Sequence, residues 1–161
     1  FVPAARNPLC FGLALLFSFW AMTVNHNVIH SSLFESRAMN RAFRLVLSFC
    51  ALFPVTSVIP SHNLVHHQFD DDGQPDWAAS ESVRFRWNLL NLLHFPNVVG
   101  PVTFAGTQAW LNVMGRGDYR RQSNLESAVA FGVTALLLVN DFWAGLFYVV
   151  FPQLFGARWF L

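Results

Sequence analysis

The sequence predicts an all-α integral membrane protein, and three observations support this fold class. Hydrophobic residues make up 54% of the 161 residues and charged residues only 12%, against roughly 25% charged residues in soluble domains. Eighteen Phe and six Trp are more than the core of a soluble domain of this length would be expected to bury. The apolar residues are also concentrated in runs of helix length. We therefore expect transmembrane helices joined by helices at the membrane interface.

The first apolar run predicts a membrane span over about 9–25. It extends from Leu9 to Val24, with polar residues before it and Asn25 after it. Its length is near the lower limit for a helix that crosses a hydrocarbon core about 30 Å thick.

The second apolar run, from Leu45 to Ile59, is interrupted by Pro54 and closed by Pro60. Proline inside a helix removes a hydrogen bond and kinks the rod. We therefore expect 41–60 to be an in-plane or re-entrant element that does not cross the bilayer.

The polar segment 61–126 is predicted to be cytosolic or interfacial, because it carries an acidic patch and several Pro and Gly residues.

The apolar segment 127–158 contains Asn140 and Asp141 near its middle. Since an Asp at the bilayer centre costs at least about 2.5 kcal/mol, we expect a hairpin that turns at these two residues. Together, these segments form a single membrane domain over 1–161.

The arginines predict the orientation of this domain. The chain has no Lys, and eight of its ten Arg lie between the first span and the hairpin. By the positive-inside rule, this side is cytoplasmic. The eight arginines between the first span and the hairpin are Arg37, Arg41, Arg44, Arg84, Arg86, Arg116, Arg120 and Arg121.

The net charge of +1 gives no reason to expect a nucleic-acid partner.

Five of the six His fall in two short clusters, HNVIH and HNLVHH. Residues four apart lie on one face of a helix, so His26 with His30, and His62 with His66, can each direct two imidazoles to one point. His67 is rotated by about 100° from His66 and can serve a second ion. The sequence therefore predicts a metal site built from these five residues.

Several functions fit a site of neutral imidazoles, which suits iron, zinc, copper and nickel. A shared site requires both clusters to lie on one side of the membrane. A zinc protease is disfavoured, because Asn27 and Asn63 stand where the H-E-x-x-H motif needs its glutamate. A membrane haem electron carrier and a metal transporter remain alternatives of another class.

The two clusters resemble the histidine boxes of the membrane fatty acid desaturase superfamily. The likeness rests on a first box of H-x3-H type, a second box ending in HH, and the acidic stretch FDDDGQPDW that follows. It implies a non-haem centre of two Fe ions held by His26, His30, His62, His66 and His67, with O2 as co-substrate. It also implies desaturation of a fatty acyl chain in the lipid bilayer, with electrons from a ferredoxin, rubredoxin or cytochrome b5. A hydroxylase or carotenoid ketolase on the same scaffold is the nearest alternative.

This sequence departs from the family pattern at two points. The second box has three residues between His62 and His66, where the commoner form has two. The family also has a third box, of HxxHH type, which does not occur before Leu161. We therefore expect the chain to be a fragment that lacks the third box and is inactive alone.

Acceptors around the imidazoles are the remaining candidates, because ligand His residues usually donate their outer N–H to a carboxylate or carbonyl. His94 is predicted to be an interfacial or hydrogen-bonded residue. Asn25 and Asn27 are predicted to lie at the helix end and to support the ligands without binding metal themselves. The candidate carboxylates are Glu35, Asp70, Asp71, Asp72 and Asp76.

Overall fold

The computed structural model describes residues 6–60, 62–63, 89–113 and 117–160. This part of the chain is helical and contains no strand, which confirms the all-α fold class. The helices are α1 (Pro8–His30), α2 (Arg37–Ala51), α3 (Val55–Ile59), α5 (Leu89–Val113), α6 (Gly117–Asn140), α7 (Phe142–Gly145), the π-helix η4 (Leu146–Val150) and α8 (Phe151–Phe160).

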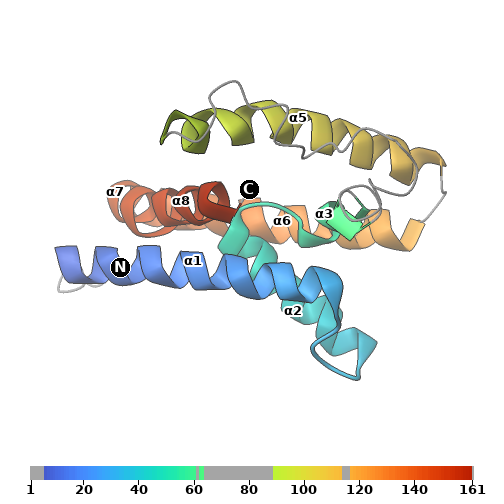
Figure 1. Ribbon diagram of the computed structural model, residues 1–161. Coiled ribbons are helices and arrows are strands. Elements are labelled where there is room, and N and C mark those ends of the chain that lie inside the picture. Colours follow the sequence, from blue (N-terminus) through green and yellow to red (C-terminus); the bar gives the residue numbers. More distant parts are fainter. Residues whose placement is uncertain (1–5, 61, 64–88, 114–116, 161) are drawn as a thin grey trace.

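The long helices lie roughly parallel to one another (Figure 1). Helix α1 packs along α8, and α6 runs antiparallel to α1 (Figure 1). Helices α2 and α3 lie near the carboxyl-terminal end of α1, and both contact it as well as α6. Helix α5 contacts α3, α6 and α8. This arrangement places the end of α1, α3 and the start of α6 at one end of the bundle.

Helix α1 continues five residues beyond the expected span and includes both histidines of the first cluster. It begins at Pro8, where the Asn7 side chain accepts the Cys10 N–H at 2.9 Å. It ends where Ser31 adopts an extended conformation. The 23 residues of α1 give a length of about 35 Å at 1.5 Å per residue, enough to cross a hydrocarbon core.

The second apolar run is divided between α2 and α3, and the break lies at 52–54. Leu52 takes the left-handed conformation, with φ 57°, and Pro54 precedes the first residue of α3. The hydroxyl of Ser48 accepts the Val55 N–H at 3.0 Å and links the two helices across the break. The in-plane or re-entrant placement of 41–60 stays a prediction.

Helix α6 begins at Gly117, so its first ten residues come from the segment expected to be cytosolic or interfacial. The helix ends at Asn140, and the side chain of Asp141 accepts the Ala144 N–H at 3.1 Å to begin α7. The chain therefore turns at the two residues where the hairpin was expected to turn. Placement of this hairpin in the bilayer stays a prediction.

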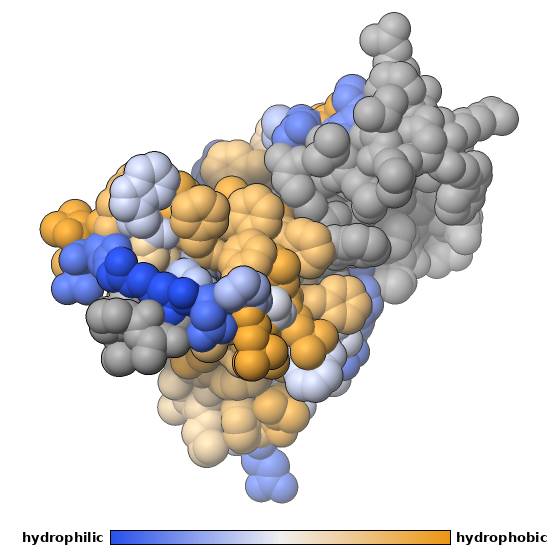
Figure 2. Space-filling view, turned by 90° about the vertical axis from the view of Figure 1, so that its left-hand side faces the viewer, coloured by the Kyte–Doolittle hydropathy of each residue, from blue (hydrophilic) through white to orange (hydrophobic). Residues whose placement is uncertain are grey.

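Two of the described helices, α1 and α6, are long and apolar enough to cross a membrane. Large apolar side chains on both are exposed, including Leu9 at 73% and Val139 at 86%. Figure 2 views the bundle from the end at which α1 begins and shows hydrophobic residues over much of its described surface. Contiguous apolar surface of this kind is rare on soluble proteins and suits contact with lipid.

A close approach between α1 and α8 predicts one large effect on stability. A Cβ added at Gly156 would lie 2.9 Å from the carbonyl oxygen of Ser18 and would also meet its side chain. Small residues at such contacts let membrane helices pack closely. Gly156→Leu is expected to separate the two helices and to destabilise the protein by about 1–3 kcal/mol, measured as a lower melting temperature in detergent.

Gly132→Leu is the matched control, because a Cβ at Gly132 on α6 meets nothing within 4 Å. Its melting temperature is expected to stay close to that of the unmodified protein. Equal losses for the two variants would contradict the importance of the α1–α8 contact.

Candidate metal centre

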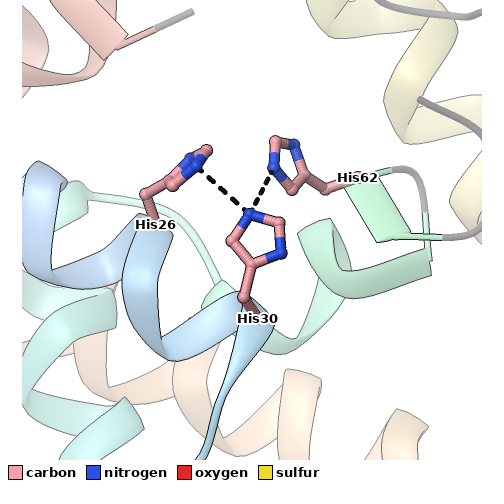
Figure 3. A group of neighbouring side chains, drawn as sticks. All are labelled: His26, His30 and His62. Atoms are coloured by element: carbon pink, nitrogen blue, oxygen red, sulfur yellow. Dashed lines mark hydrogen bonds between the residues drawn. The ribbon is translucent and has the colours of Figure 1, made fainter. Parts of the chain in front are cut away.

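Three imidazoles from two separate segments meet at one end of the bundle (Figure 3). His26 and His30 lie on the last two turns of α1, spaced so that both point to the same side. His62 follows α3, in a short π-helical turn. The rings of His26 and His62 both point toward the ring of His30 (Figure 3).

The distances between these rings fit a shared metal ion. The Nε2 atom of His30 lies 3.2 Å from Nε2 of His26 and 3.2 Å from Nε2 of His62. The ligand atoms of all three residues lie within 4.8 Å of one another. Nitrogens bound to one zinc-like ion at about 2.0–2.1 Å are separated by roughly 3 Å when they are adjacent ligands. The set therefore needs little rearrangement to hold one cation.

Burial differs among the three residues. His26 and His62 are half-buried, whereas His30 is exposed. The centre is thus built against the bundle on one side and open on the other. Such an arrangement can bind an ion firmly and still leave room for further ligands or a substrate.

Asn63 joins the second histidine segment to the first. Its side-chain amide donates to the carbonyl oxygen of Ile29 at 2.8 Å. Ile29 precedes His30 and Asn63 follows His62, so this hydrogen bond places the two histidines opposite each other. Sequence patterns assign no positive role to Asn63, because its partner is a backbone atom 34 residues away.

Glu126 anchors α3 from a second side. Its carboxylate is fully buried and accepts the Thr56 N–H at 2.8 Å and the Thr56 hydroxyl at 2.6 Å. The side-chain amide of Gln122 donates to the same carboxylate at 2.9 Å. A buried carboxylate with several donors is well satisfied, and here it fixes the helix that leads into His62. In the sequence, Glu126 is marked only as an acidic residue beside an apolar run, which does not identify it as an anchor.

The remaining predicted residues fall into two groups. His66, His67, Asp70, Asp71, Asp72 and Asp76 lie outside the described residues. Among the described residues, the cluster of possible ligands includes neither Glu35, which is exposed before α2, nor His94 on α5. Asn25 is buried, and its side-chain amide makes no hydrogen bond within the described part of the chain.

Thiolate ligands do not contribute to this cluster. Cys10 and Cys50 are free cysteines, and neither joins the three histidines. Burial raises the pKa of the Cys50 thiol above its ordinary value. A donor set of neutral imidazoles suits iron, copper, nickel or zinc and gives no basis for an Fe–S cluster.

Comparison with known proteins gives one match. The family model described as fatty acid desaturase matches residues 4–161. No curated protein and no solved structure matches the chain.

Proposed function

The chain belongs to the fatty acid desaturase family, and we propose that it serves O2-dependent desaturation of a fatty acyl chain at a histidine-ligated di-iron centre. The observation that carries the proposal is the convergence of His26, His30 and His62 at the end of a helix of membrane-spanning length. Membership of the family indicates an oxidoreductase that acts on lipid in a membrane.

In this proposal, His26, His30 and His62 hold one ion together with His66, and His67 serves the second. Bound iron would supply the power to oxidise an unactivated C–H bond with O2. Desaturation removes two hydrogen atoms from neighbouring carbons and, with two electrons and two protons, reduces O2 to two water molecules. The electrons would come from a donor such as a ferredoxin, rubredoxin or cytochrome b5.

The residues of the chain itself hold and orient this centre. Asn63 and Glu126 keep the segment of His62 against α1 and α6, so that its imidazole faces the other two. The exposed apolar sides of α1 and α6 would keep the protein in the bilayer. An acyl chain could then reach the centre from the lipid while its ionic end stays at the membrane surface.

We also propose that the histidine end of the bundle faces the cytoplasm. Arg37, Arg41 and Arg44 lie on α2, near the end of α1 that carries the histidines, and Arg121 lies on the first turns of α6. Arg6 pairs with Asp141 at the opposite end, where α1 begins. This charge distribution agrees with the positive-inside rule.

Product analysis tests the reaction. Membranes from cells that express the complete reading frame encoding this chain are expected to convert a saturated acyl lipid into a product lighter by two hydrogen atoms. The conversion should need O2 and an electron donor, and gas chromatography with mass spectrometry detects it.

Other results would identify the alternative functions. A hydroxylated or keto product without a new double bond would replace desaturase by hydroxylase or ketolase. A Soret band in the purified protein would indicate a haem electron carrier, and metal-dependent transport without oxidation would indicate a transporter.

A further inference from the structure

A polar cavity of about 860 Å³ lies near the metal centre and takes no part in the proposed reaction. Its walls come from α2, from Thr56 on α3, from the first turns of α6 and from Ser32, two residues beyond His30. The cavity is therefore at the same end of the bundle as the three histidines.

Arginines dominate the wall of this cavity. Arg37, Arg41 and Arg44 are spaced so that they share one face of α2, and Arg121 approaches from α6. Asp118 is the one carboxylate among the lining residues. Among the residues that the structure describes, Arg6 and Asp141 form an ion pair at the other end of the bundle, and no ion pair involves the arginines of the cavity. The four guanidinium groups therefore leave an excess of positive charge within one hollow.

Arg44 has an unsatisfied donor at this wall. Its Nε atom is buried and has no hydrogen-bond partner in the described part of the chain. Its terminal nitrogen is 3.5 Å from the Thr56 hydroxyl, at the limit of a hydrogen bond. An anion in the cavity would offset the positive charge of Arg44 and of the other three arginines that line it.

The first turn of α6 lies at the same cavity. Gly117 and Asp118 line it, and they begin a helix of 24 residues. The first N–H groups of a helix have no partner within the helix, and its dipole favours a nearby anion. Guanidinium forks and helix amides together form the donor set typical of a phosphate site.

We propose that this cavity binds the phosphate group of an anionic membrane lipid. Helix α2 supports a lipid as the source, because it leaves the apolar side chains of Met39 and Val46 exposed while its arginines line the cavity. Exposed apolar side chains and arginines on one helix suit the boundary between acyl chains and headgroups. Arginines that only obey the positive-inside rule would not need to share one cavity.

Lipid binding to the full chain in detergent tests the proposal, with native mass spectrometry as the readout. Wild-type protein is expected to retain phosphatidic acid at least about tenfold more strongly than phosphatidylcholine. Arg121→Gln and Arg41→Gln should each weaken phosphatidic acid binding by about tenfold, as expected when a charged hydrogen-bond donor is lost.

Arg120→Gln is the matched control. Arg120 neighbours Arg121, carries the same charge and donates to Asn112 on α5, yet it does not line the cavity. Its variant should bind phosphatidic acid as wild type does. Equal weakening in all three variants would overturn the proposal, because the attraction would then be a property of the whole basic surface.

Competition by inorganic phosphate distinguishes a lipid headgroup from free phosphate as the source of the bound phosphate group. Weak competition that requires millimolar phosphate would support a lipid headgroup, because the acyl chains then add to the affinity. Phosphate binding as tight as that of phosphatidic acid would overturn the lipid assignment. Since Arg41 and Arg121 are both exposed, unchanged gel-filtration profiles are expected and would show that the variants fold.

Discussion

Replacing His30 with alanine is expected to remove iron from the protein and to abolish oxidation of the acyl chain. Its Nε2 atom lies 3.2 Å from both other imidazoles, so it is the central member of the cluster. Without it, the described part of the centre keeps only His26 and His62. Removing only the hydrogen-bond partner of a metal ligand weakens metal binding by about 10–100-fold. Removing the ligand His30 itself should weaken it at least as much. Elemental analysis of purified protein measures iron per chain.

His94→Ala is the control for this experiment. His94 lies on α5 and is not among the three clustered histidines. Its variant should retain the iron content of the unmodified protein. Full iron occupancy in His30→Ala would contradict the proposed centre, whereas loss of iron in both variants would point to a general effect on folding.

Replacing Glu126 with alanine is expected to have the second-largest effect. The change removes the acceptor of the Thr56 N–H and the Thr56 hydroxyl, both buried, and of the half-buried Gln122 amide. Each buried donor left without a partner costs about 1–3 kcal/mol, so the total loss should be on the order of 3 kcal/mol. Because α3 leads into His62, iron binding should fall as well. Thermal unfolding in detergent and iron content measure the two effects.

Glu126→Gln and Asp118→Asn complete this comparison. Glutamine keeps the size of the side chain and one acceptor oxygen, so we expect a smaller loss of stability than with alanine. Asp118 is exposed on the same helix, and its variant should melt as the unmodified protein does. Unchanged stability and iron content in Glu126→Ala would show that the buried carboxylate does not position α3.

Local rules explain the parts of the fold that the sequence predicts well. The break between α2 and α3 follows from Pro54, and the turn after α6 follows from the polar pair Asn140 and Asp141. The ends of helices were predicted less well. Helix α1 runs on to His30 because nothing in the sequence NHNVIH breaks a helix. Hydropathy marks only where the apolar run ends, and the helix continues beyond that point.

Contacts between distant segments could not be predicted in this way. Glu126 and Thr56 are 70 residues apart, and Asn63 bonds a backbone carbonyl of α1. The arginine cavity likewise needs α2 and α6 side by side. No spacing rule relates such residues, because each contact depends on how whole helices pack.

By itself, the sequence determined the all-helical membrane character of the protein and the shared face of His26 and His30. Both follow from short-range physics, since the period of a helix and the cost of placing polar groups in lipid act within a few residues. The two histidine clusters also predicted a site that His62 shares with this pair, but only the tertiary structure decided that Asn63 and Glu126 hold its segment in place. The physical reason is that bringing these segments together requires helix packing, whose geometry depends on the whole bundle and not on any one segment.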